Sequence, residues 1–349
     1  MSPKPRKLLF IRLSSLGDVV LASSALQAPQ FEKDEKHFLT SEEYSSLFQT
    51  HPSVFKLWTF RRRSGLRAWL DLCRFLENEN FDKIYDLHSS TRTWILRIFL
   101  RLRHGLGLHQ GPISEILVLK KSRFSNYGLF LFKKYFPKSM LAPSLLEQIS
   151  RLTQSTKIIK ADLRHLTDPA KSQPTRSKAH IGLMPSSLWK QKEWPLNKWL
   201  ELCRALKGRA DFVVFGTPAD GLSLELEKIL KSEGLLLGDS FVGKNSLDQV
   251  AKKIANADLF IGVDTGLCHL AQALSVPTLV IYGPTHESAG YPVWGVRSQA
   301  VGKKLWCRPC GKTGKYCVQI LSPYKCLQQL ESLELLSIVN THFTSKAEL

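Results

Sequence analysis

A glycine turn between an apolar run and an expected helix forms the first candidate ligand site. Asp264, Thr265 and Gly266 separate the run at residues 259–263, which has the length of a buried strand, from helical spacing at residues 267–274. Such a turn gathers free backbone N–H groups and the positive end of the helix dipole at one point, where they attract phosphate. An ordinary crossover in which Asp264 only caps the helix is the alternative interpretation.

A second polar cluster follows the apolar run at residues 180–184. It contains the hydroxyl groups of Ser186 and Ser187 and the ammonium group of Lys192, before Pro195 marks a helix start. Hydroxyl groups and a lysine at the carboxyl end of a strand suit a diphosphate, to which Lys192 would contribute a point charge. A solvated basic loop is the alternative. The second cluster strengthens the prediction that the glycine turn binds an anionic ligand.

The chain begins with the same arrangement of strand, polar turn and helix. Residues 7–13 have the pattern of a strand, a turn with Ser15 and Gly17 follows, and Asp18 lies in the first turn of the next expected helix. A carboxylate at a helix start is favoured by the helix dipole, which would be a structural role. The alternative is a general base at the carboxyl end of a parallel sheet, where α/β folds bind their ligands.

A third polar turn follows the short apolar run at residues 84–87. It carries His88 and Arg92, which either face the same sheet edge or form a plain turn with a solvated arginine. From residue 92 to residue 138 the chain has ten Lys or Arg residues and one acid, Glu115, with apolar side chains interleaved. This composition suits docking on anionic lipid headgroups or an anionic glycolipid. RNA binding is disfavoured because the sequence contains no RNA-binding motif.

The order of the expected elements predicts two α/β domains. The length of 349 residues suits two domains of ordinary size. Strand and helix patterns alternate up to a polar segment at residues 167–178, which we take as a linker, and the alternation then restarts. Two successive α/β units imply doubly wound parallel sheets that face each other across a cleft. The formal net charge of +19 indicates an anionic partner.

Three motifs in these turns resemble glycosyltransferase family 9, the ADP-heptose:lipopolysaccharide heptosyltransferases. They are S-S-L-G-D at residues 14–18, K-E-W-P at residues 192–195 and D-T-G-x-x-H-x-A-x-A-L-x-x-P-x-x-x-x-Y-G-P-T at residues 264–285. The resemblance implies a GT-B fold with two Rossmann-like domains. The expected ranges are 1–170 for an acceptor-binding domain, 178–325 for a nucleotide-sugar-binding domain, and 326–349 for a tail that packs back on the first domain.

The same resemblance implies a reaction. It is an inverting transfer of a heptose from ADP-heptose, with no required cofactor or metal, to the lipopolysaccharide inner core, either Kdo-lipid A or heptosyl-Kdo-lipid A. The expected partners are the nucleotide sugar and an anionic glycolipid, and no nucleic acid. The enzyme would be cytoplasmic and bound peripherally to the inner face of the cytoplasmic membrane. Another nucleotide sugar or glycan acceptor is one alternative, and a non-catalytic basic protein that binds nucleotides or RNA is another.

Positions that match the family motifs receive expected roles. Asp18 would take the proton of the acceptor hydroxyl, and Lys192 would neutralise the charge that develops on the departing diphosphate. The other expected donor-binding residues are Ser186, Ser187, Asp220, Asn245, Asp264, Thr265, Gly266, Leu267 and His269. The expected acceptor-binding residues are Ser15, Gly17, His88 and Arg92. Asp220 would bind the ribose and Asn245 the adenine edge, whereas a structural role within its helix is the favoured interpretation for His269.

Four of the seven cysteines lie near the end of the chain, at Cys307, Cys310, Cys317 and Cys326. Cys307 and Cys310 have the spacing of a zinc half-site, but the other two do not form a second tight pair. Disulfides would be unexpected in a cytosolic protein. Free, reduced thiols are therefore the expected state, and a structural zinc ion held by these four cysteines is the alternative.

Overall fold

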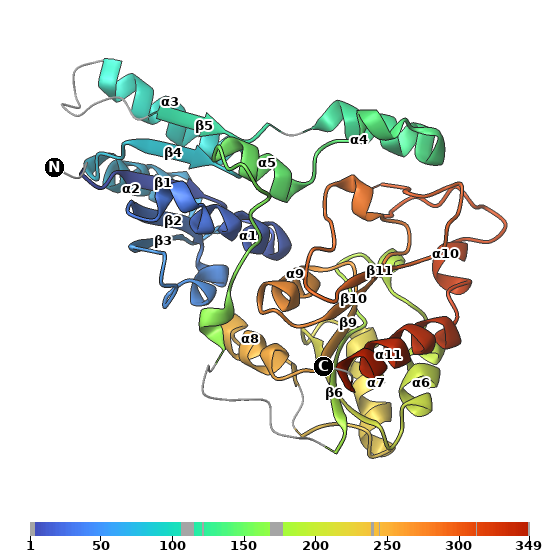
Figure 1. Ribbon diagram of the computed structural model, residues 1–349. Coiled ribbons are helices and arrows are strands. Elements are labelled where there is room, and N and C mark those ends of the chain that lie inside the picture. Colours follow the sequence, from blue (N-terminus) through green and yellow to red (C-terminus); the bar gives the residue numbers. More distant parts are fainter. Residues whose placement is uncertain are drawn as a thin grey trace. The chain divides into compact units, whose positions relative to one another are not determined.

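The computed structural model describes residues 4–105, 115–120, 122–167, 177–238, 241–243, 245–311 and 313–347. Its contacts divide the chain into two compact units, whose elements are labelled in Figure 1. Unit 1 consists of Met1–Lys121 and Leu145–Leu166, and unit 2 consists of Ser122–Ser144 and Thr167–Leu349. This division differs from the predicted ranges because residues 122–144 group with unit 2. Most of the predicted linker at residues 167–178 lies outside the described residues.

Unit 1 is built on a parallel sheet with the strand order β3-β2-β1-β4-β5 in the part of the chain that the structure describes. The strands are β1 Lys7–Ile11, β2 Glu35–Ser41, β3 Lys56–Phe60, β4 Lys83–Asp86 and β5 Glu115–Val118. The α-helices are α1 Leu16–Ala22, α2 Gly65–Asn78, α3 Thr91–Gly105 and α5 Leu145–Leu152. The strand order reverses between β1 and β4, which pair with each other. Open α/β sheets bind ligands at such a switch point, outside the carboxyl ends of the strands.

Unit 2 has the same architecture, with a parallel sheet in the order β11-β10-β9-β6-β7-β8 among its described residues. The strands are β6 Ala179–Met184, β7 Ala210–Gly216, β8 Phe241–Val242, β9 Leu259–Val263, β10 Thr278–Ile281 and β11 Gln299–Val301. The α-helices are α4 Arg123–Phe132, α6 Leu196–Ala205, α7 Gly221–Ser232, α8 Leu247–Ala255, α9 Gly266–Ala273, α10 Lys325–Gln328 and α11 Ser332–Ala347. The order reverses between β6 and β9, which forms the second switch point.

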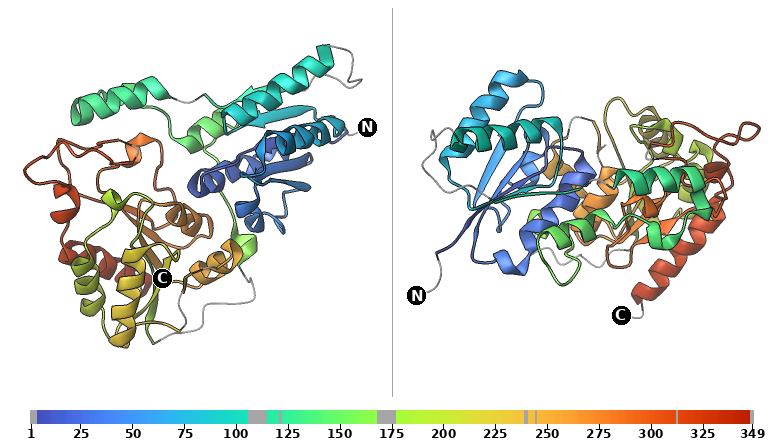
Figure 2. Two further views of the ribbon diagram at one scale, coloured as in Figure 1. Left: turned by 180° about the vertical axis from the view of Figure 1, so that it is seen from behind. Right: turned by 90° about the horizontal axis from the view of Figure 1, so that it is seen from above.

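The central strands are apolar because helices cover both faces of each sheet (Figure 2). Every residue of Leu259–Val263 is buried, and in β1 only Lys7 is partly exposed. The rings of Trp194 and Trp199 meet edge to face at 5.2 Å in the core of unit 2. The strand expected at residues 259–263 is therefore confirmed, and the one expected at residues 7–13 is present but ends at Ile11. The sequence did not reveal β3, because this edge strand exposes several side chains and lacks an uninterrupted apolar run.

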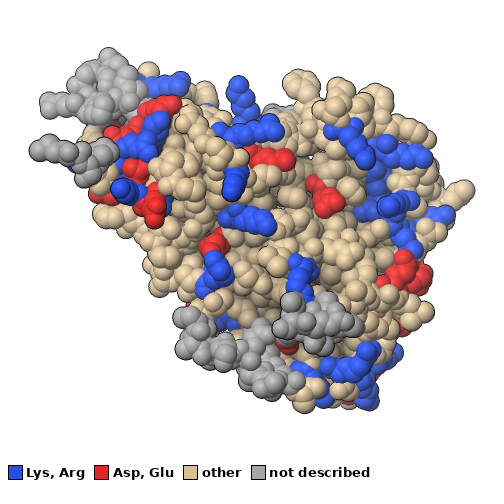
Figure 3. All heavy atoms as spheres, viewed as in Figure 1, with Lys and Arg blue, Asp and Glu red and all other residues tan. Residues whose placement is uncertain are grey.

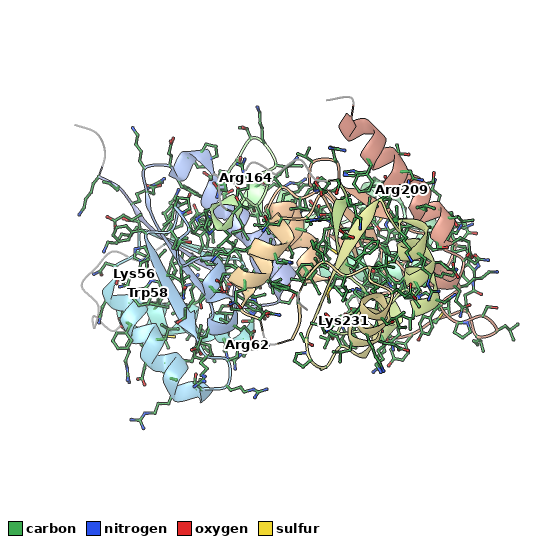
Figure 4. All side chains as sticks on the ribbon, turned by 90° about the horizontal axis from the view of Figure 1, so that it is seen from below. Lys56, Trp58, Arg62, Arg164, Arg209 and Lys231 are labelled. Atoms are coloured by element: carbon green, nitrogen blue, oxygen red, sulfur yellow. The ribbon has the colours of Figure 1, made fainter. Side chains whose placement is uncertain are left out.

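Helix α11 packs within unit 2. It contacts α6, and its side chains Leu335 and Val339 are fully buried in the core of this unit. Arg209, labelled in Figure 4, precedes β7 and donates a 3.1 Å hydrogen bond from Nη1 to Oδ1 of Asn340 on α11. These contacts cover the apolar face of α6 with the amphipathic tail, and the packing of the tail on the first domain stays a prediction.

Candidate active site

The predicted donor residues follow the carboxyl ends of neighbouring strands in unit 2. Ser186, Ser187 and Lys192 follow β6, Asp220 follows β7, Asn245 follows β8, and residues 264–269 follow β9. These strands are parallel, so their carboxyl ends share one edge of the sheet. The structure therefore brings the predicted residues to the edge that contains the switch point between β6 and β9.

An ion pair joins the two strands at this switch point. Lys192 Nζ lies 2.7 Å from Asp264 Oδ2, and the two side chains are only 11 % and 15 % exposed. Thr285 Oγ1 donates a 2.8 Å hydrogen bond to the same carboxylate oxygen. Asp264 thus orients the ammonium group of Lys192 at the sheet edge. An ammonium group has three donors, so it suits an anionic ligand in addition to its contact with Asp264.

Helix α9 begins directly after this ion pair. Thr265 is the N-cap residue, and its side chain makes no capping hydrogen bond to the described residues. The first N–H groups of a helix have no partner inside the helix, so those of Gly266 and Leu267 suit a phosphate group. Gly262 allows β9 and α9 to approach closely, since a Cβ atom there would lie 2.7 Å from Cys268 Sγ. Burial raises the pKa of the Cys268 thiol to about 12, which leaves this neighbour uncharged.

The two serines after β6 make different contacts. Ser186 is fully buried, and its hydroxyl oxygen accepts hydrogen bonds from the backbone N–H of Ser223 at 3.0 Å and from its hydroxyl at 2.9 Å. This link ties the loop after β6 to α7, and the contact of Ser186 with the donor stays a prediction. Ser187 is partly exposed, and its backbone N–H donates to Glu193 Oε1 at 3.0 Å, which shapes the loop that carries Lys192.

The predicted nucleotide-binding residues differ in exposure. Asp220 is the N-cap residue of α7 and accepts a 2.6 Å hydrogen bond at Oδ2 from the backbone N–H of Thr217. Asn245 is partly exposed in the turn before α8. His269 is 5 % exposed, and its ring centre lies 6.2 Å from that of Tyr291. Burial favours a structural role for His269, whereas Asp220 and Asn245 stay candidates for contacts with the nucleotide.

A buried arginine connects the cysteine-bearing segment to the Lys192 site. Arg308 Nη2 donates to the backbone oxygens of Tyr282 at 2.8 Å and Thr285 at 3.0 Å. Thr285 in turn binds Asp264 through its hydroxyl group. Arg308 therefore fixes the turn after β10 that supports the ion pair. The sequence analysis missed both Arg308 and Thr285, although Thr285 is the last residue of the third motif.

The four late cysteines influence one another electrostatically. Burial raises the pKa of Cys326 to about 11; Arg308 opposes this effect, and the other three cysteines add to it. Among the described residues, no group of three or more His, Cys, Asp and Glu side chains is placed to hold a metal ion. Burial also raises the pKa of the Cys310 thiol, so it favours the neutral form of Cys310 and Cys326. Metal analysis of the purified protein tests the zinc alternative.

In unit 1, a cation from the preceding strand end holds Asp18. Arg12 Nη2 lies 2.8 Å from Asp18 Oδ2, which also accepts hydrogen bonds from the backbone N–H and the hydroxyl of Ser15 at 3.2 and 3.0 Å. Burial alone would raise the pKa of the Asp18 carboxyl, but the Arg12 charge and the Ser15 hydrogen bonds outweigh it and lower the pKa. Asp18 Oδ1 is buried and accepts no hydrogen bond from the described residues. This oxygen favours a ligand that brings a donor.

Two further predicted acceptor residues of unit 1, His88 and Arg92, follow β4. Asp86 ends this strand fully buried, and its Oδ1 accepts a 3.1 Å hydrogen bond from the backbone N–H of His88, which fixes the start of the turn. Arg92 Nη2 donates a 3.0 Å hydrogen bond to the backbone oxygen of Arg62 in the loop after β3. The carboxyl edge of the sheet in unit 1 therefore carries Arg62 from the loop after β3 and Arg92 from the first turn of α3.

The sequence analysis missed two arginines at this edge. Arg12 is a charged residue at the end of a buried apolar run, and that position was the available signal. Arg62, labelled in Figure 4, pairs with Glu43 at 3.2 Å and could be placed only once β3 was known. Gly17, another predicted acceptor residue, is buried in α1, and its contact with the acceptor stays a prediction.

Comparison with known proteins identifies the family. The family model described as glycosyltransferase family 9 (heptosyltransferase) matches residues 69–320, which is well over half of the chain. The chain belongs to glycosyltransferase family 9. Lipooligosaccharide heptosyltransferase 2 of Campylobacter jejuni is 28 % identical over 342 residues, covering 93 % of this chain and 98 % of the relative. Lipopolysaccharide heptosyltransferase 1 of Campylobacter coli is 26 % identical over 303 residues, covering 80 % of this chain and 84 % of the relative.

A solved structure agrees with the fold of this family 9 glycosyltransferase. The E. coli ADP-heptose lipopolysaccharide heptosyltransferase II superposes with a TM-score of 0.71 at 17 % identity, covering 98 % of this chain and 99 % of that chain. The predicted GT-B fold with two Rossmann-like domains is confirmed by this likeness and by the strand order of the two sheets. The predicted enzyme class, a glycosyltransferase, follows from membership of family 9.

Proposed function

We propose that this family 9 enzyme transfers a heptose from ADP-heptose to the lipopolysaccharide inner core, with inversion at the anomeric carbon. The acceptor would be Kdo-lipid A or heptosyl-Kdo-lipid A. Two relatives named as lipopolysaccharide or lipooligosaccharide heptosyltransferases support the sugar and the acceptor, and the E. coli enzyme named for ADP-heptose supports the donor. The observation that carries the proposal is the ion pair of Lys192 and Asp264 beside the start of α9.

On the donor side, the proposed ligand of Lys192 is the diphosphate. The N–H groups at the start of α9 would share this role, and together they would neutralise the charge that develops when the bond from the sugar to the diphosphate breaks. We propose that this positive environment acts without a metal or cofactor. The further donor contacts in the proposal are Ser187, Asp220, Asn245, Thr265, Gly266 and Leu267.

On the acceptor side, Asp18 would act as the general base. The acceptor hydroxyl attacks the anomeric carbon from the face opposite the diphosphate, its proton passes to the carboxylate, and ADP departs as the new glycosidic bond forms. Arg12 and Ser15 support this role because they favour the ionised carboxylate. Arg62, in the loop after β3, and Arg92, in the first turn of α3, would attract phosphate groups of the inner core.

We further propose that the enzyme is cytoplasmic and works at the inner face of the cytoplasmic membrane, where its glycolipid acceptor would be presented. The formal net charge of +19 supports an anionic surface as a partner. No nucleic acid is part of the proposal. In the chain as described, none of the helices is both long enough and apolar enough to cross a membrane.

The first experiment is a thermal-shift titration with ADP, UDP, GDP and ADP-heptose, followed by a transfer assay with purified Kdo-lipid A and heptosyl-Kdo-lipid A. Ligands that bind only the native state raise the melting temperature, so ADP and ADP-heptose should act selectively. Mass spectrometry should detect the added heptose, and the anomeric configuration of the product tests inversion. Preference for UDP or GDP would exclude ADP-heptose as the donor. Salt-sensitive RNA binding without any sugar transfer would overturn the enzymatic proposal.

A further inference from the structure

Helix α4, labelled in Figure 1, turns apolar side chains to solvent. Phe124, Tyr127 and Leu131 are 93 %, 70 % and 73 % exposed. They occupy positions i, i+3 and i+7, so they lie along one face of the helix. Leu129 lies on the opposite face and is 4 % exposed. The exposed face is called the α4 stripe below, and it is apolar where an ordinary surface helix carries polar side chains.

The apolar exposure continues into the turns after the helix. The exposed side chains there and at the helix end are Phe132, Tyr135 and Met140, at 57 %, 74 % and 60 %. Phe136 instead packs on the helix, where a Cβ atom at Gly128 would lie 2.5 Å from its ring. Ser125 Oγ donates a 2.6 Å hydrogen bond to the backbone oxygen of Met140. The segment is therefore folded back on α4, with its remaining aromatic side chains directed to solvent.

All charged residues in the stretch of sequence that contains α4 are positive. Residues 116–146 contain no Asp or Glu, and their charged residues are Lys120, Lys121, Arg123, Lys133, Lys134 and Lys138. Lys134 Nζ lies 4.8 Å from the ring centre of Tyr135, so at least one of these cations is directly beside the exposed aromatic side chains. Figure 3 shows that Lys and Arg also predominate over Asp and Glu on the molecular face it draws.

We propose that the α4 stripe docks the enzyme on an anionic phospholipid bilayer, with α4 lying in the plane of the interface. Aromatic side chains sit at the level of the headgroups in such an interface, and lysines meet lipid phosphates. A second copy of the chain is a poorer occupant, because it would place these uncompensated positive charges against each other. The inference rests on the proposed function in one respect, namely that the enzyme meets a membrane. The exposed apolar side chains of the α4 stripe and the nearby lysines do not depend on which sugar is transferred.

The test uses full-length protein sedimented with vesicles of phosphatidylcholine, alone or mixed with phosphatidylglycerol. The protein should bind the anionic vesicles, and added salt should weaken the binding. Combined substitution Phe124→Ser, Tyr127→Ser and Leu131→Ser should lower vesicle partitioning by about tenfold or more, because the inserted apolar area is lost. Combined substitution Lys133→Ala, Lys134→Ala and Lys138→Ala should have a similar effect, because three lipid contacts are lost.

Matched controls alter equally exposed residues elsewhere in unit 2. Leu333→Ser removes an apolar side chain at the start of α11 that is 72 % exposed. Lys207→Ala, Lys228→Ala and Lys231→Ala together remove three exposed cations, of which Lys231 is labelled in Figure 4. Both control proteins should bind vesicles like the wild type. Unchanged vesicle binding by the α4 variants would overturn the inference.

Two further measurements test whether the α4 stripe packs within the chain or binds a second copy of the chain. A lower melting temperature of the Phe124, Tyr127 and Leu131 variant would show that the stripe packs within the chain. Conversion of a dimer to a monomer in light scattering would show that it binds a second copy. Either result would overturn the inference. The expected result is an unchanged melting temperature and an unchanged mass.

A delipidated, water-soluble acceptor distinguishes this inference from the proposed function. The α4 variants should transfer sugar to that acceptor at the wild-type rate and lose rate only with the lipid acceptor in anionic vesicles. If the wild type transferred no heptose but still bound vesicles through α4, the proposed function would fail and the docking surface would stand. Equal loss of rate with both acceptors would overturn the docking inference alone.

Discussion

Arg12 Nη2 lies 2.8 Å from Asp18 Oδ2, so a cation at the end of β1 holds a carboxylate in the first turn of α1. Unit 2 has a pair of reversed polarity at its own switch point, where Asp264 at the end of β9 holds Lys192. One sheet edge therefore presents a supported carboxylate and the other a supported ammonium group. These are the two charges that the proposed transfer needs, a proton acceptor and a counter-charge for the diphosphate.

Asp18→Asn should abolish most transfer while donor binding is kept. An amide cannot take the hydroxyl proton, and general bases typically contribute about a hundredfold or more to the rate. We expect kcat to fall by at least about that factor, with ADP affinity unchanged by calorimetry. Asp71→Asn is a matched control, because Asp71 is 45 % exposed and pairs with Arg74 on the surface of α2. Near-normal turnover of the Asp18 variant would remove Asp18 from the mechanism.

Arg12→Gln should move the acid limb of the pH profile to higher pH. Arg12 lowers the pKa of Asp18, and without it the opposing effect of burial raises that pKa. The base works only when it is deprotonated, so more of it is inactive at mildly acidic pH in the variant. The wild-type kcat/KM should stay flat down to pH values below the ordinary pKa of aspartate.

The pH dependence of kcat/KM for Arg12→Gln, Arg74→Gln and the wild type provides the comparison. The Arg74 variant should follow the wild type, because that arginine contacts only an exposed carboxylate in the described structure. Thermal melting accompanies the assay, since Arg12 Nη1 also donates to the backbone oxygen of Leu87. An acid limb that does not move in a folded Arg12 variant would contradict the role given to Arg12.

Lys192→Ala should weaken the binding of ADP and ADP-heptose. A hydrogen bond to a charged group contributes about 1.5–3 kcal/mol, which corresponds to roughly ten- to hundredfold in Kd. Lys190→Ala is the matched control, because Lys190 is exposed two residues away in the same loop. Asp264→Asn should also weaken binding, since Lys192 then loses the carboxylate that orients it. Unchanged calorimetric Kd values for the Lys192 variant would exclude a contact with the diphosphate.

The stability of unit 1 should fall in mild acid because of two buried histidines. Burial lowers the pKa of both His37 and His51 to about 4, whereas in the unfolded chain it is about 6.5. Between these values the unfolded state binds more protons than the native state. The stability contribution is therefore fully present above pH 6.5 and is lost as the pH falls towards 4.

Urea unfolding at pH 7 and pH 5 checks this expectation. The free energy of unfolding of the wild type should be smaller at pH 5, and His51→Gln should reduce the difference between the two pH values. His51 is a suitable target because it lies at the surface of the core, 3 % exposed, where Gln27 offers a polar neighbour at 3.4 Å. Equal free energies at the two pH values in the wild type would contradict the assignment.

The sequence predicted where the strands that carry the site end. It did not predict which side chains from different strand ends contact each other. Apolar runs and the glycine turn located β9 and the start of α9 because those signals are local. The contact between Lys192 and Asp264 spans 72 residues and depends on β6 lying beside β9, which periodicity does not encode. Likewise, one position separates the buried Ser186 from the partly exposed Ser187, and only the packing of α7 decides between them.

The grouping of residues 122–144 with unit 2 gives the chain three backbone connections between its units, after Lys121, after Ser144 and after Leu166. A single connection would act as a swivel and leave rotation about several axes open. With three connections, rigid-body rotation is restricted to axes about which none of the three backbone segments is strained. We therefore expect that cutting the chain near residue 170 separates residues 122–144 from the unit with which they make most of their contacts.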